Sequence, residues 1–113
     1  MVLAMAMIDL ATVREHCRID EDDLSEDNLL GIYTGAAKRH VEKFTRRKLY
    51  VLNTDPGFDT DDDHLLLDDD IRLAMLLLIG HWFANREAVS DKSFSEVPLA
   101  VDALLQPFVI YGV

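Results

Sequence analysis

Several kinds of residue are scarce in this chain of 113 residues, and each scarcity excludes a class of protein. With a single cysteine, Cys17, the chain cannot form an internal disulfide or build a cysteine-rich zinc site. Lys and Arg total 11 against 21 Asp and Glu, and the resulting net charge of −10 disfavours a general clamp for nucleic acid. No apolar run is long enough to cross a bilayer, and residues 1–7 lack the basic start of a signal peptide, so we expect no membrane partner.

Sequence motifs of enzymes are also missing. The chain has no G-x-S-x-G, no P-loop and no G-x-G-x-x-G. Its histidines, His16, His40, His64 and His81, form no H-x-x-x-H or H-E-x-x-H pair. Cys17 adjoins His16, but sequence neighbours on a helix do not face each other, which disfavours a nucleophilic pair. We therefore expect no enzyme, no cofactor and no metal, and we interpret His81 as a hydrogen-bonded histidine of the core or of an interface.

One aspartate-rich stretch invites a calcium interpretation. Asp59, Asp61, Asp63 and Asp70 have the spacing of oxygen ligands in an EF-hand loop. His64 stands where that loop needs glycine, and no helix leads directly into it. We interpret the stretch as an acidic loop followed by a helix cap, with adventitious binding of divalent cations as the alternative.

The residues that are present predict one small helical domain. Half of them are hydrophobic and 28% are charged, which is a globular balance. Apolar periodicity predicts a short helix over residues 10–16 after Asp9, and a long one that begins after Ser25 as its N-cap. The apolar stripe of the long helix consists of Leu29, Leu30, Tyr33, Ala37, Val41 and Phe44.

A third helix, over about residues 71–86, is apolar nearly all round and should be the buried central helix, capped by Asp68, Asp69 and Asp70. A fourth should contain Pro98 in its first turn and end at Pro107. Residues 48–67 should form a short hairpin or an extended loop. The fold class is thus all-α, a bundle of about four helices, with an N-terminal extension (1–8), a helical domain (9–107) and a C-terminal tail (108–113).

The charges are segregated along the chain. Six acids lie within residues 20–27, eight within residues 55–70, and six of the eleven basic residues within residues 38–48. Such strips suit head-to-tail contact between copies, although solvated surface charge is the simpler alternative. The candidate interface cations are Lys38, Arg39, Lys43, Arg46 and Arg47. The candidate acids of an exposed loop are Asp59, Asp61, Asp62 and Asp63.

Two further features are candidates for contact with a partner. Gly31 and Gly35 inside the long helix permit close approach of another backbone, within the subunit or between subunits. Phe108, Ile110 and Tyr111 belong to an apolar tail that has little core left to cover it, so docking on a partner is one interpretation. Folding back over the central helix is the other.

Two stretches resemble phage head–tail connector proteins. Residues 36–49 resemble the end of the family's long helix, in which small residues and a Val-Glu pair precede a Thr-x-Arg-x-Leu-like ending. Residues 71–108 resemble its second half, in which an apolar helix with a terminal aromatic precedes a Pro-initiated helix and a Leu-Leu-x-Pro-aromatic close. Two departures are Val109-Ile110, where the family often has Arg, and a short hairpin region rich in Asp.

The resemblance implies a structural subunit of the virion, made in the cytoplasm of the bacterial host. It implies a homo-oligomeric ring that matches the symmetry of the portal protein, binds it, and receives the next head–tail joining protein. DNA would pass without specific binding through a channel whose acidic wall Asp59, Asp61, Asp62 and Asp63 are candidates to form. The alternative function is a small acidic helical binding module, such as a DNA-mimicking inhibitor or a regulator.

Overall fold

Four α-helices and a short 3₁₀ helix dominate the structure, a computed structural model that describes residues 8–85 and 96–110. In chain order the elements are α1 (Leu10–His16), α2 (Asp27–Thr45), β1 (Leu49–Tyr50), β2 (Leu65–Leu66), α3 (Asp69–Ala84), α4 (Glu96–Leu105) and the 3₁₀ helix η2 (Gln106–Phe108). The prediction of a small all-α bundle is confirmed. Helix α1 has the predicted bounds, although the side chain of Asp9 makes no capping hydrogen bond.

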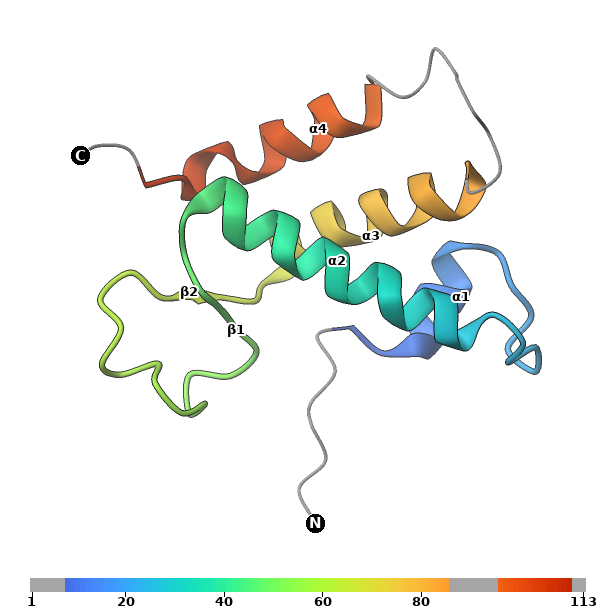
Figure 1. The fold of residues 1–113 in the computed structure, drawn as a ribbon, viewed down its shortest axis with the longest axis horizontal. Helices are drawn as coiled ribbons and strands as arrows, with labels where there is room; N and C mark the ends of the chain where they lie inside the picture. The colour runs from blue at the N-terminus through green and yellow to red at the C-terminus, as the bar shows by residue number, and fades with distance from the viewer. Residues whose placement is uncertain (1–7, 86–95, 111–113) are drawn as a thin grey trace.

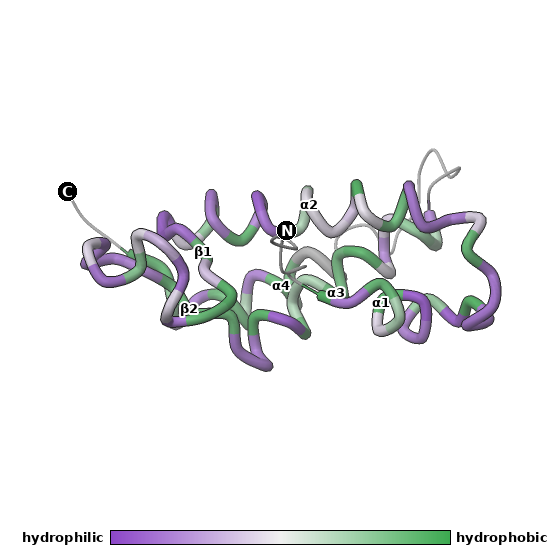
Figure 2. Tube along the Cα trace, turned by 90° about the horizontal axis from the view of Figure 1, so that it is seen from below, coloured by the Kyte–Doolittle hydropathy of each residue, from purple (hydrophilic) through white to green (hydrophobic). Residues whose placement is uncertain are grey.

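The helices form a flat slab with extents of 40 × 40 × 19 Å. Helix α2 makes one layer, and α1, α3 and α4 make the other (Figures 1 and 2). Helix α3 lies between α1 and α4 and packs against α2, so it is the central helix that the sequence predicts.

The core lies between the two layers. Helix α3 contributes five fully or almost fully buried apolar residues, and α2 supplies most of the facing side chains. The side chains of α3 in this core are Ile71, Ala74, Met75, Leu78 and Ile79, and those of α2 are Leu30, Ala37 and Val41. Burying each large apolar side chain stabilises the fold by roughly 1.5–3 kcal/mol relative to leaving it in water.

The two long helices begin differently from each other. The side chain of Asp68 accepts a hydrogen bond of 3.0 Å from the backbone N–H of Ile71, which confirms the cap predicted for α3. The predicted Ser25 cap of α2 is wrong, because Glu26 holds the N-cap position. The amide and hydroxyl of Ser25 instead donate to Oδ1 of Asp23, at 3.0 and 2.6 Å. These bonds stabilise the carboxylate and lower the pKa of Asp23.

The segment between α2 and α3 contains a parallel pair of two-residue strands. Leu49 is opposite Leu65, and Tyr50 is opposite Leu66. The hairpin prediction is therefore wrong, and the extended-loop alternative describes the segment better. Parallel strands need a long crossover, and residues 51–64 provide it as an excursion at one end of the slab (Figure 1).

The ends of the described chain also differ in part from expectation. Ile8, which the sequence places in the N-terminal extension, is buried in the core with 4% of its surface exposed. Residues 1–7 lie outside the described residues. Helix α4 begins two residues before Pro98 and ends at Leu105, and Pro107 lies within η2. The division into an N-terminal extension, a domain over residues 9–107 and a C-terminal tail therefore stays a proposal. Ile8 moves from the extension into the domain.

Candidate functional site

The first candidate surface is the side of α2 that faces away from α3, which we call the outer face of α2. Helix residues two positions apart lie on nearly opposite sides, so the buried Leu30, Ala37 and Val41 direct their second neighbours outward. The exposed residues of this face are Asn28, Gly31, Ile32, Gly35, Ala36, Arg39 and Lys43, with Arg46 at the C-cap. The residues of this face from Gly31 to Ala36 are small or apolar, and those from Arg39 to Arg46 are basic.

Gly31 and Gly35 have no close neighbour from other elements in the described part of the subunit. A Cβ atom built at either glycine would meet no heavy atom within 4 Å. No helix within residues 8–85 and 96–110 therefore packs closely against these glycines, and contact between subunits remains the open alternative. Ile32 lies between them with 60% of its surface exposed.

The predicted interface cations divide into two groups. Arg39, Lys43 and Arg46 are exposed, and none of them makes an ion pair among the described residues. Lys38 is half-buried at the edge of the outer face. Arg47 points inward and serves the fold of its own subunit.

Arg47 joins three segments of the chain. Its Nε donates a hydrogen bond of 2.7 Å to the carbonyl oxygen of Phe108, and its Nη1 donates one of 3.3 Å to that of His64. Arg46 adopts a left-handed conformation with φ of 63° and ends α2, which leaves the carbonyl of Thr45 free to accept from the N–H of Ile110 at 3.0 Å. Helix α2 thus holds the C-terminal segment at its own end.

These contacts bear on the predicted docking tail. Phe108 and Ile110 are half-buried, and Phe108 packs against the core. Residues 108–110 make hydrogen bonds to the end of α2 in their own domain, so ordering only on a partner is wrong for them. Tyr111 lies outside the described residues. Docking through the remaining surface of Phe108 and Ile110 stays a proposal.

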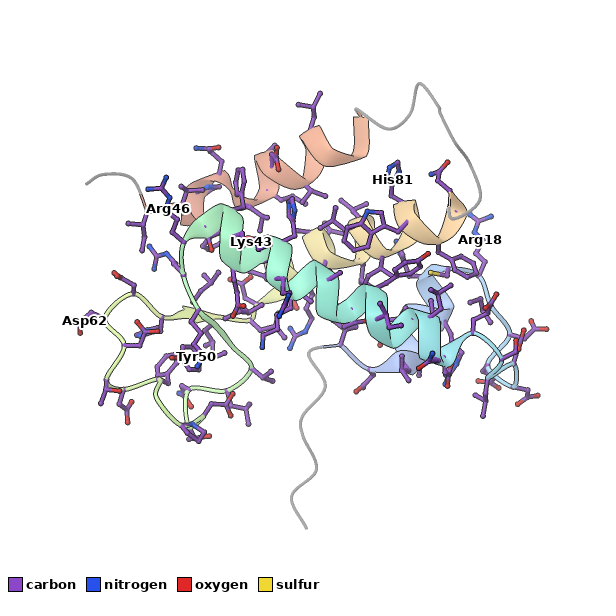
Figure 3. All side chains as sticks on the ribbon, in the orientation of Figure 1. Arg18, Lys43, Arg46, Tyr50, Asp62 and His81 are labelled. Carbon is purple, nitrogen blue, oxygen red and sulfur yellow. The ribbon has the colours of Figure 1, made fainter. Side chains whose placement is uncertain are left out.

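The acidic loop, residues 51–64, is organised by its own side chains. The hydroxyl of Tyr50 donates to Oδ2 of Asp61 at 3.0 Å, and the ring of Phe58 packs edge-on against Tyr50 and tilted against His64. Burial, together with the hydrogen bond to Asp61, raises the pKa of Tyr50. Figure 3 shows Tyr50 inside the curve of the loop and Asp62 on its outer edge.

The four acids predicted for this loop therefore fall into two groups, one half-buried acid and three exposed ones. Asp61 is half-buried and structural, since it also accepts from the backbone N–H of Asp63 at 3.0 Å. The side chains of Asp59, Asp62 and Asp63 are exposed and leave three carboxylates for an external role. No group of three or more His, Cys, Asp or Glu side chains that could hold a metal ion is found within residues 8–85 and 96–110.

Several internal contacts were not evident from the sequence. Arg14 of α1 pairs with Asp27 of α2 through Nη1, at 2.7 and 2.9 Å from the two carboxylate oxygens. His40 and Asp102 approach to 3.8 Å between α2 and α4. No local signal predicts either pair, because the partners come from different helices.

The remaining nucleophile and histidine candidates have structural surroundings. Cys17 is half-buried, and burial raises the pKa of its thiol, which opposes formation of a reactive thiolate. His81 is buried, as predicted, and Nδ2 of Asn85 lies 3.4 Å from its Nδ1 and donates to its carbonyl oxygen at 2.9 Å. No helix in the described part of the chain is both long and apolar enough to span a membrane.

The fold and these surfaces define a small helical domain whose prominent features are exposed faces. The chain matches the phage gp6-like head-tail connector protein family over residues 7–108, and it therefore belongs to that family. No curated protein and no solved structure matches the chain. The family is one of structural phage connector proteins and not of enzymes, so membership assigns a structural role in the connection between head and tail of a virion.

Proposed function

We propose that copies of this chain form a homo-oligomeric ring that binds beneath the portal protein, matches its symmetry and receives the next head–tail joining protein. The ring extends the DNA channel, and the chain is made in the cytoplasm of the host and catalyses no reaction. Family membership supports the location, and the outer face of α2 supports the assembly. This face presents Arg39, Lys43 and Arg46 without ion-pair partners in the described residues, in a chain whose net charge is −10.

The acidic loop supports a role at the channel. Asp59, Asp62 and Asp63 are exposed on an excursion at one end of the slab (Figures 1 and 3). Carboxylates that line a channel repel the phosphates of DNA, so the genome slides past without being held. In this proposal the three acids face the channel, while Phe108 and Ile110 at the same end of α2 contribute to the portal contact.

The direct test uses a phage mutant that has the other head genes but lacks the gene for this chain. We expect filled heads without tails, and purified chain added to them should restore tail attachment. If heads without the chain attach tails as well as normal heads do, the connector role is contradicted. A chain that instead inhibits a DNA-binding protein would favour the alternative of an acidic binding module.

The channel role has a separate test with a matched control. Changing Asp59, Asp62 and Asp63 to Lys should leave rings and tails intact but slow the ejection of DNA, most strongly at low salt where screening is weakest. The control changes to Lys three exposed acids of the other acidic segment, residues 20–27. These acids are Asp20, Glu21 and Asp22. If both triple variants eject DNA at the same rate, the loop does not line the channel.

A further inference from the structure

The central helix has an uncovered side. Leu73 is two residues from the buried Ile71 and Met75, so it lies on the opposite side of α3, and 45% of its surface is exposed. Leu77, one turn further on, is half-buried. Asp69, one turn earlier, is fully exposed at its carboxylate, which already pairs at 3.1 Å with Arg72 of the same helix. We call Asp69, Leu73 and Leu77 the outer side of α3.

The two uncovered helix surfaces lie on opposite sides of the slab. Helix α2 forms one layer, and its outer face points away from α3. Helix α3 lies in the other layer (Figure 2), and its outer side is opposite the face of α3 that is buried in the core. Each surface has a partly exposed aliphatic side chain, Ile32 with 60% and Leu73 with 45% of its surface exposed.

Charge and apolar groups follow the same order along both surfaces. Helices α2 and α3 run in opposing directions, so the C-terminus of α2 and the N-terminus of α3 lie at the same end of the slab (Figure 1). At that end α2 presents Lys43 and Arg39, and α3 presents Asp69. Further along each helix lies an apolar side chain. At a rise of 1.5 Å per residue, Ile32 lies about 10 Å from Arg39 along α2, and Leu77 lies about 12 Å from Asp69 along α3.

We propose that the outer face of α2 in one copy docks on the outer side of α3 in the next copy. Stacking two slabs in the same orientation places the cations of α2 over Asp69 and the apolar half of α2 over Leu73 and Leu77. Gly31 and Gly35 on either side of Ile32 allow the close approach that this packing needs. The inference rests on the proposed ring and names the surfaces that build it.

This contact is head-to-tail, because each copy uses a different surface toward each neighbour. Contacts of this type continue until a ring closes, whereas a two-fold contact through α2 alone stops at a dimer and leaves Leu73 in water. The contact therefore suits a ring with a channel.

Cross-linking tests the contact directly. In a Cys17→Ala background, the double variant Ile32→Cys with Leu73→Cys should form a ladder of covalent oligomers with a bis-maleimide reagent. Either single-cysteine variant should stay monomeric. The matched control is Leu24→Cys with Leu73→Cys, because Leu24 is 60% exposed like Ile32 but lies outside both surfaces. No ladder from the first pair, or dimers from Ile32→Cys alone, would overturn the proposal.

A mixing experiment tests the polarity of the contact. A carboxylate buried without a partner at an interface is strongly unfavourable, so Ile32→Asp and Leu73→Asp should each weaken self-association by about a hundredfold or more. Because each variant keeps one intact surface, an equimolar mixture should form one-to-one dimers and nothing larger. Leu24→Asp should assemble like the unmodified chain. A mixture that stays monomeric, or single variants that assemble normally, would contradict the head-to-tail contact.

Head completion separates this inference from the proposed function. If the chain completes heads and both aspartate variants do so equally well, the contact is wrong and the connector role stands. If the cross-linked ladder forms but the chain does not restore tails to heads that lack it, the contact stands and the connector role fails.

Discussion

Replacing Arg47 tests whether this side chain stabilises the fold of its own subunit or is available to bind a partner. Arg47→Ala removes the guanidinium that donates to the carbonyl oxygens of Phe108 and His64. Hydrogen bonds from a charged group contribute about 1.5–3 kcal/mol, and both carbonyls would lose their charged donor. Since Arg47 is only partly buried, we expect a loss of about 2 kcal/mol in the free energy of unfolding.

The assay is urea unfolding followed by the fluorescence of the single tryptophan, Trp82, together with thermal unfolding by circular dichroism. A loss of about 2 kcal/mol should lower the Tm by about 10 °C in a domain of this size. Arg47→Met keeps most of the aliphatic stem, so it separates the lost hydrogen bonds from the lost packing.

The neighbouring Arg46 provides the control. It is exposed and makes no ion pair in the described part of the chain, so Arg46→Ala should change stability by no more than about 0.5 kcal/mol. Its effect should appear in self-association, because Arg46 belongs to the outer face of α2. If Arg47→Ala unfolds at the same urea concentration as the unmodified chain, the hydrogen bonds of Arg47 do not hold the C-terminal segment in place. Arg47 is then available to a partner.

Three other perturbations test the fold. Ile79→Ala should cost about 2–5 kcal/mol in urea unfolding, because Ile79 is fully buried in α3, and a change below 1 kcal/mol would contradict the central position of this helix. Gly31→Ala and Gly35→Ala should each raise monomer stability by up to about 1 kcal/mol, since no neighbour opposes a Cβ atom, and a loss would indicate an unseen contact. Tyr50 should ionise at higher pH than an unfolded tyrosine, so stability should fall as the pH rises above about 10. Asp61→Asn should reduce this shift in an ultraviolet titration without abolishing it, because burial is its larger cause.

Local patterns in the sequence predicted most of the helices. The bounds of α1, the apolar stripe of α2 and the Asp68 cap of α3 each depend on residues within a few positions of one another. Ser25 failed as a cap because α2 begins one residue later, with Glu26 at the N-cap, and the hydroxyl and amide of Ser25 donate to Asp23 instead. Competing local hydrogen bonds of this kind are difficult to rank from sequence.

Contacts between distant segments were not predictable from local patterns. Arg47 and Phe108 are 61 positions apart, and only the folded chain shows that the guanidinium points inward. The same limit applies to the parallel pairing of β1 with β2, since a turn signal at Asp55-Pro56-Gly57 suits a hairpin as well as a longer loop. Of the five candidate cations, the structure leaves Arg39, Lys43 and Arg46 on one exposed face.

The most direct test of the connector assignment is a cryo-electron microscopy reconstruction of the neck of the assembled phage particle. We expect a closed ring of this chain between the portal protein and the next joining protein, with α2 of each copy against α3 of its neighbour and the acidic loop toward the DNA. Density at the neck that cannot accommodate this fold, or a ring in which copies contact each other only through other surfaces, would contradict the account.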